Sequence, residues 1–183
     1  MFKPISEDFE VHMFGLDVRL VRPEDTEFIL SLRTDEVLTR NIHSTDNDAA
    51  KHLEWFARYK DREKEGRDYY FIYFKEGKPI GVNRIYNIYE YYGTPGSWLC
   101  CRDNEPNVSL ATYFFAREIQ FQYLGLDILI YDVRKANKKV WKMHKMLGAI
   151  QVGESEIDYY FTMNKENYYA KRDKVLKTLG LSI

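Results

Sequence analysis

Three side chains that could take part in chemistry lie along one edge of a predicted helix in the last third of the chain. Asn137, Trp141 and His144 are spaced four and then three residues apart, which brings side chains together on a helix surface. An imidazole exchanges a proton near neutral pH, so His144 is the candidate catalytic residue. An amide has no useful pKa, so Asn137 is better suited to hydrogen bonding. The alternative is structural, with Asn137 near the helix start and the two rings half-exposed over a sheet.

The helix that carries these residues follows an apolar strand predicted over residues 126–133. Gly148 is expected to end the helix. Its apolar face is predicted from four residues at helical spacing: Ala136, Val140, Met143 and Leu147.

An earlier apolar helix is expected to start after a polar loop over residues 102–107. A helix N-terminus presents unpaired N–H groups and the positive end of the helix dipole, and both favour an anion such as phosphate. The alternative is a plain helix start with Asn107 as its cap.

The remaining segments predict a mixed α/β (α+β) sheet with helices on both faces. Further strands are expected over residues 9–13, 16–21, 69–74, 79–88, 97–101, 150–153 and 157–163, with a turn or break at 92–96. Further helices are expected after Arg22, after polar capping residues at 43–47, and over residues 164–179.

Composition predicts a single packed domain spanning residues 1–183. Hydrophobic residues make up 45% of the chain, and 27 Lys and Arg against 28 Asp and Glu leave a formal charge of −1. This balance gives no footprint for nucleic acid or an acidic membrane. The absence of a signal peptide, of a run of about 18 apolar residues and of separated cysteine pairs predicts a cytoplasmic protein without a membrane segment. We expect no metal site.

The order of these elements resembles the GNAT superfamily of N-acetyltransferases over nearly the whole chain. In that family, the helix after the fifth strand has an Asn, an aliphatic residue three positions on, a Tyr seven on and Gly-Phe eleven and twelve on. Here Asn137, Val140 and Gly148 match that pattern, whereas His144 replaces the Tyr and Ala149 replaces the Phe. The opening residues 18–25 and residues 132–144 are most similar to nucleotide-amino-sugar and RimJ/RimL-like acetyltransferases.

The resemblance implies a mostly antiparallel, twisted sheet of about seven strands, splayed between the family's fourth and fifth strands, with acetyl-CoA between them. The phosphate loop of the family corresponds to residues 106–111, which lack the usual basic residue and first glycine. The resemblance implies a set of cofactor-binding residues: Leu99, Cys100, Cys101, Asn107, Val108, Ser109, Leu110, Ala111, Asn137, Val140, Trp141 and His144.

The implied reaction is direct attack of a primary amine on the thioester. His144 would assist the leaving thiol, whose pKa is about 8.5, and Glu90, Asp132 or Glu154 would take the proton of the amine. The residues expected to bind a small-molecule acceptor, such as a nucleotide-linked amino sugar, are Asn83, Tyr86, Asn87 and Trp98.

Two other functions fit the same pattern. One is acetylation of a protein N-terminus, which an open groove would favour. The other is a non-catalytic CoA-binding module, which the altered phosphate loop and the missing Tyr favour. A homodimer is a further expectation.

Overall fold

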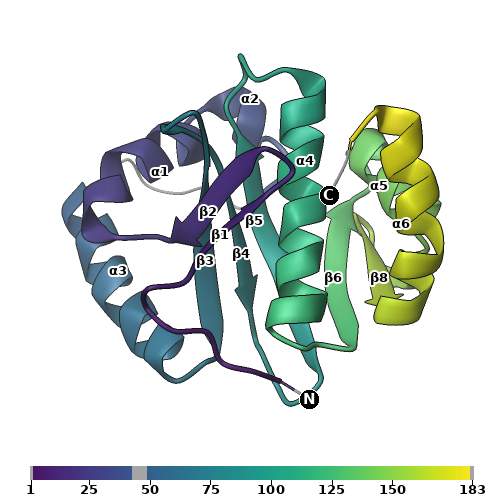
Figure 1. Ribbon diagram of the computed structural model, residues 1–183, viewed down its shortest axis with the longest axis horizontal. Helices are drawn as coiled ribbons and strands as arrows, with labels where there is room; N and C mark the ends of the chain where they lie inside the picture. Colours follow the sequence, from purple (N-terminus) through teal and green to yellow (C-terminus); the bar gives the residue numbers. More distant parts are fainter. Residues whose placement is uncertain (1, 43–48, 182–183) are drawn as a thin grey trace.

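The computed structural model describes residues 2–42 and 49–181, which form one open sheet with helices on both faces (Figure 1). Within the described residues the sheet has eight strands in the order β1-β2-β3-β4-β5-β6-β8-β7. The strands are β1 (Glu10–Met13), β2 (Leu16–Leu20), β3 (Asp68–Lys75), β4 (Lys78–Tyr86), β5 (Tyr92–Cys100), β6 (Ile128–Arg134), β7 (Ile150–Glu154) and β8 (Asp158–Asn164). All neighbours are antiparallel except β5 and β6. The mixed, mostly antiparallel architecture is therefore confirmed, with eight strands in place of about seven.

The helices lie where the apolar spacing predicted them, with one addition. They are α1 (Thr26–Arg33), α2 (Glu36–Thr39), α3 (Ala49–Lys64), α4 (Pro106–Glu118), α5 (Lys138–Met146) and α6 (Lys165–Leu179). A π-helical turn, Ile119–Tyr123, extends α4. The short α2 has no apolar periodicity and was not predicted; it begins where the Asp35 side chain accepts hydrogen bonds from the amides of Val37 and Leu38. The capping residues predicted at 43–47 lie outside the described residues.

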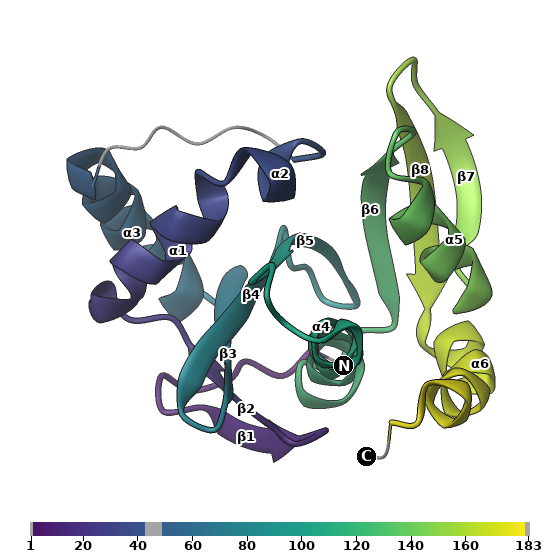
Figure 2. The same ribbon diagram turned by 90° about the horizontal axis from the view of Figure 1, so that it is seen from above.

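The first half of the sheet is covered on both faces (Figure 2). Along β3, Tyr69, Phe71 and Tyr73 join the core under α4, whereas Tyr70 and Ile72 join the core under α1 and α3. A strand buried on both faces has an apolar side chain at every position, which explains the continuous aromatic run of this segment. Within the described residues no helix is long and apolar enough to cross a membrane.

The predicted break at residues 92–96 is wrong, because these residues form the first half of β5. A Cβ atom on Gly93 would lie 3.1 Å from Ile85 Cδ1, and one on Gly96 would lie 2.8 Å from the ring of Tyr86. Both glycines therefore allow close packing against β4, and a glycine that does this inside a strand cannot be told from a turn glycine by sequence.

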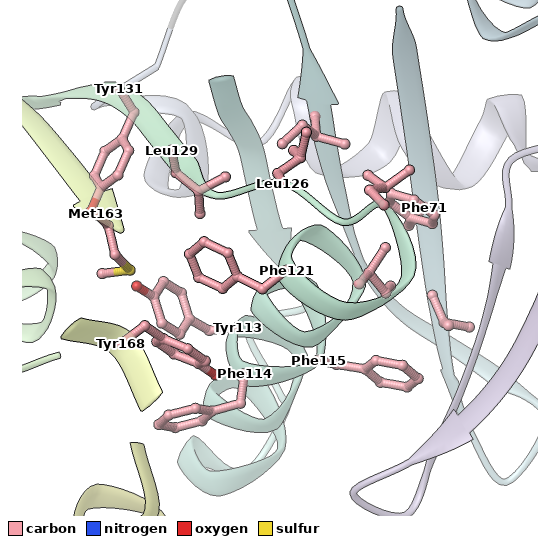
Figure 3. Packing of buried hydrophobic residues seen from close by; sticks show 14 of the residues in the cluster. Phe71, Tyr113, Phe114, Phe115, Phe121, Leu126, Leu129, Tyr131, Met163 and Tyr168 are labelled. Carbon is pink, nitrogen blue, oxygen red and sulfur yellow. The ribbon is translucent and has the colours of Figure 1, made fainter. Parts of the chain in front are cut away.

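Helix α4 packs against both halves of the sheet. Figure 3 shows Phe115 directed toward β3, while Tyr113 and Phe114 point the opposite way, toward the C-terminal half of the molecule. The helix is apolar over most of its surface because it has no broad solvent-exposed face, and it also buries Thr112, Arg117 and Glu118. It thereby forms the base on which β5 and β6 separate.

Helix α5 differs in detail from its prediction. It begins after Asn137, whose side chain accepts a hydrogen bond from the Val140 amide, and Leu147 is its C-terminal cap. Ala136 is exposed outside the helix, whereas His144 is buried. The helix is therefore turned so that His144, rather than Ala136, lies on the core side.

The packing of the end of α5 against α6 can be tested at Gly148, the glycine that matches the family pattern. Its φ of +88° is left-handed, and an added Cβ would lie 2.8 Å from the Asn167 backbone oxygen, whereas Gly180 has a φ of +67° with open space around it. We predict that Gly148→Ala lowers the free energy of unfolding by about 3 kcal/mol and Gly180→Ala by about 1 kcal/mol, because both strain the backbone but one also clashes. Urea unfolding followed by circular dichroism measures both. Equal losses would show that the contact with α6 relaxes freely.

Candidate active site

The central cleft arises where β5 and β6 stop pairing. These parallel strands are joined only at Tyr92 with Ile128 and at Gly93 with Leu129. Beyond that point a cavity of about 580 Å³ opens, lined by residues 95–98 of β5 and residues 131–134 of β6. Figure 2 shows the two strands diverging above α4. The predicted splay between these strands is confirmed.

A β-bulge in β5 faces this cleft. Val82 pairs with Leu99 and Arg84 pairs with Gly96, so β5 carries one residue more than β4 across this stretch. Ser97 lies in the bulge and adopts a left-handed backbone conformation with a φ of +49°. A bulge bends a strand and re-aims its side chains, which here brings residues 97 and 98 to the cavity wall.

The separation leaves backbone groups of β5 on an open edge. The Cys101 amide donates to the Ile80 carbonyl at 2.9 Å, and Leu99 also pairs with β4. Because backbone groups alternate direction along a strand, the amide of Cys100 faces the other edge, toward β6. Of the three residues predicted to contact the cofactor here, Cys100 presents its backbone to the cleft.

The start of α4 lies two residues earlier than predicted. Glu105 is the N-cap residue and Pro106 occupies the first helical position, so Asn107 is not the cap and residues 107–111 are helical. The amides of Val108 and Ser109 donate to the Glu105 carbonyl at 3.0 and 3.2 Å. The Asn107 amide, at the second position, has no acceptor within the helix by its geometry and remains available to an anion.

His144 is held in the cleft wall by two tyrosines. Its Nδ1 lies 3.0 Å from the hydroxyl oxygens of both Tyr113 and Tyr131, and the residue is 5% exposed. Burial, assisted by the Arg117 cation, holds the pKa of His144 well below its usual value. The ring is therefore neutral at physiological pH, and the expectation that it lies half-exposed is wrong.

The hydrogen-bond partners assign the tautomer of this neutral ring. Burial raises the pKa of Tyr113 and raises that of Tyr131 well above its usual value, so both phenols keep their protons. Among the hydrogen bonds of the described residues, Nδ1 is the partner of both hydroxyls. We assign Nδ1 as the acceptor: its one lone pair takes the hydrogen bond of one of these hydroxyls at a time, and the ring proton is then on Nε2.

The cavity gathers five of the other fifteen residues predicted to bind cofactor or acceptor. Asn83, Tyr86, Trp98, Asn137 and Val140 line it together with His144. Within this group, Asn83 Nδ2 donates to the Gly96 carbonyl at 3.3 Å, and Trp98 Nε1 donates to Thr112 Oγ1 at 2.9 Å.

Other predicted residues lie outside the cavity lining. Asn87 is exposed beyond the end of β4, and Trp141 packs against Tyr159 with ring centroids 6.0 Å apart. Leu99, Cys100, Cys101 and residues 107–111 border the open edge and the helix start instead. Of the three candidate bases, Asp132 lines the cavity, Glu90 is exposed outside the lining, and Glu154 forms an ion pair with Lys135 at 3.3 Å.

Arginines are the lining residues that the sequence did not single out. The lining includes four of them, Arg33, Arg84, Arg117 and Arg134, and a single carboxylate, Asp132. Arg84 donates to buried Asp68 at 2.7 Å and Arg134 to Asp158 at 3.0 Å, while Arg33 donates to Ser97 Oγ at 3.2 Å. The lining itself therefore has more cations than carboxylates, although Asp68 and Asp158, which lie outside it, are paired with two of the four arginines. A usable signal existed for Arg117, because an arginine inside an apolar helix face needs a structural or functional reason.

Known structures share this arrangement. A nucleotide-linked sugar GNAT, FdhC in its apo form, is 30% identical, covers 93% of this chain and 98% of its own, and superposes with a TM-score of 0.81. The chain belongs to the GNAT superfamily. Mycobacterium smegmatis RimJ, solved with CoA-disulfide, has a TM-score of 0.75 at 14% identity over 94% of this chain and 93% of its own. Spermidine N-acetyltransferase from Vibrio cholerae, solved with CoA and spermine, has a TM-score of 0.72 at 14% identity over 85% and 98%.

No protein-family model and no curated protein sequence matches the chain. The two neighbours at 14% identity share the fold, whereas the nucleotide-linked sugar GNAT is also similar in sequence. The protein is thus a GNAT acetyltransferase.

The neutral, buried state of His144 has a measurable consequence for this GNAT. The unfolded chain binds a proton at His144 below about pH 6.5 whereas the native protein does not, so native stability falls as pH drops below that value. We predict a slope of up to about 1.4 kcal/mol per pH unit from this group, which His144→Gln removes. Urea unfolding between pH 7.5 and 5 measures it. His12→Gln, at an exposed histidine, is the control and should retain the slope.

Proposed function

We propose that this acetyltransferase moves the acetyl group of acetyl-CoA to the primary amine of a small, negatively charged molecule such as a nucleotide-linked amino sugar. The main support is the cavity lining of four arginines and one carboxylate. Such a lining attracts an anion and repels a polyammonium acceptor. The similarity to a nucleotide-linked sugar GNAT supports the same class of acceptor.

The chain has backbone groups suited to acetyl-CoA, which supplies the acyl thioester. The open edge of β5 offers the Cys100 amide to the extended pantetheine arm or the acetyl carbonyl, as a strand edge does for an added peptide. The Asn107 amide and the dipole of α4 favour the pyrophosphate. Asn137 and Val140 border the same cleft from α5.

Asp132 is the carboxylate placed to accept the proton of the attacking amine. It stands on β6 in the cavity lining, across from Tyr86 of β4. As the carbon–nitrogen bond forms and the carbon–sulfur bond breaks, the amine loses one proton, which Asp132 takes directly or through water. Two arginines of the same lining, Arg33 and Arg84, would hold the anionic groups of the acceptor.

His144 acts as a neutral hydrogen-bond donor to the departing sulfur. Its Nε2–H faces away from the two phenols that hold Nδ1. Because a thiol has a pKa of about 8.5, the leaving thiolate needs stabilisation more than full protonation near neutral pH. A neutral imidazole meets that need even though its low pKa prevents it from acting as an imidazolium acid.

An acceptor panel tests the proposed function. We predict that acetyl-CoA binds by calorimetry and that CoA release is at least tenfold faster, in kcat/KM, with nucleotide-linked amino sugars than with spermidine or peptide N-termini. Arg33→Gln should raise the KM for the anionic acceptor about tenfold, because it removes one charge–phosphate contact. Arg67→Gln, at an exposed arginine paired with Glu65, is the control. Faster turnover of a peptide N-terminus, or binding of acetyl-CoA without turnover of any amine, would overturn the acceptor or the enzyme assignment respectively.

Replacing His144 tests the donor assignment separately. We predict that His144→Ala lowers kcat roughly 100-fold with little change in the KM for acetyl-CoA, because the lost hydrogen bond forms as the sulfur leaves. His12→Ala, which removes an exposed histidine bonded to Asp17, is the control. Unchanged turnover in a folded His144→Ala protein would remove the donor role and leave acetyl transfer intact.

A further inference from the structure

The feature that the proposed chemistry leaves unused is the cation of Arg117, which lies beneath the cleft. The residue is 3% exposed in α4, yet it borders the cavity between β5 and β6. Its Nη1 donates to Gln120 Oε1 at 2.6 Å, and its Nε has no hydrogen-bond partner among the described residues. Within the same described part of the chain it forms no ion pair with a carboxylate.

A buried arginine without a carboxylate is costly. Removing a charged group from water costs several kcal/mol unless nearby groups compensate. The neighbouring residue, Glu118, is also buried, but its carboxylate accepts hydrogen bonds from Arg172, Tyr168 and Tyr169. A methionine or leucine at this position would avoid the cost, so the buried arginine calls for a specific explanation.

The compensation for this charge comes from two aromatic rings. The Arg117 guanidinium lies 4.5 Å from the ring centroid of Tyr113 and 5.6 Å from that of Tyr131. These are cation–π distances, and such contacts are strongest when desolvated. The same two tyrosines bring their hydroxyls to Nδ1 of His144. Arg117 therefore contacts both residues that hold the imidazole.

We propose that Arg117 is a positioning residue for His144: its guanidinium clamps the rings of Tyr113 and Tyr131 so that both hydroxyls meet Nδ1, which directs the Nε2 proton into the cleft. The proposal rests on the donor role of His144 in the proposed function. The π-helical turn that begins two residues later agrees with a local distortion retained at a functional position.

The charge of Arg117 supports this role. The ionisable groups that face His144 are Tyr113 and Arg117 from α4 and Tyr131 from β6, while β8 contributes the uncharged ring of Phe161. Arg117 is therefore the permanent charge in the surroundings of the imidazole. After burial, its repulsion is the second cause of the low pKa of His144. A second proton, at Nδ1, would turn this atom from an acceptor into a donor and reverse its hydrogen bonds with the phenols, and the cation opposes that protonation.

Imidazole ¹⁵N NMR on the whole protein tests the proposal without depending on acetyl transfer. In the wild-type protein we expect His144 to stay neutral between pH 5.5 and 8, with a protonated Nε2. In Arg117→Met we expect a mixture of tautomers or protonation within this range, a kcat about tenfold lower and an unchanged KM for acetyl-CoA. Arg67→Met is the matched control and should leave the His144 signals unchanged.

Arg117→Lys keeps the charge but loses the planar group that contacts both rings. We expect His144 to stay neutral in this variant while both tautomers become populated. If Arg117→Met does not fold, Arg117→Lys still tests the proposal. A folded Arg117→Met or Arg117→Lys protein with wild-type His144 signals would overturn the positioning role, whatever its activity. If no amine is acetylated by the wild-type protein, the proposed function fails, and the NMR result still decides the link between Arg117 and His144.

Discussion

The site depends on the early end of pairing between β5 and β6. A parallel pair normally continues along both strands, but here it stops after two residue pairs. Helix α4 lies beneath the point of separation, and its aromatic side chains pack toward both halves of the sheet (Figure 3). A single helix can cover both halves only if they tilt apart above it. The cleft, the open edge of β5 and the position of His144 all follow from this packing.

Where the two strands separate, polar groups lose the partners that a continuous sheet would give them. These groups must form hydrogen bonds with other residues, with water or with a ligand. Buried charges elsewhere are paired, as in Asp68, which accepts hydrogen bonds from Arg62 and Arg84. In the cleft several polar atoms lack partners within the described residues, including Asn83 Oδ1 and Arg117 Nε. Since burying an unpartnered polar atom costs about 1–3 kcal/mol, such atoms belong where a ligand or water completes them. The polar deficit of the cleft is consistent with a binding site.

At position 144 the proposed hydrogen-bond donor is a histidine, whereas the family pattern has a tyrosine. Here the imidazole is neutral because it is buried beside a cation, and two phenols supplied by α4 and β6 fix its orientation. A neutral ring with a fixed tautomer offers one N–H in one direction, as a phenol offers one O–H. In the proposed mechanism, the substitution preserves the kind of donor rather than its acidity.

The sequence alone determined the element order and the two helices of the site. It also showed that His144 and Asn137 belong to the second of these helices and that the start of the first, α4, lacks the family's basic residue. These are local properties, since apolar spacing, capping residues and turn glycines act within about ten residues. Only the tertiary structure decided that residues 92–96 belong to β5, that His144 is buried, and that Arg117 contacts Tyr113 and Tyr131. These facts depend on how α4 packs against strands far away in the chain. No local pattern carries that information, because burial and charge environment are set by neighbours that only the fold brings together.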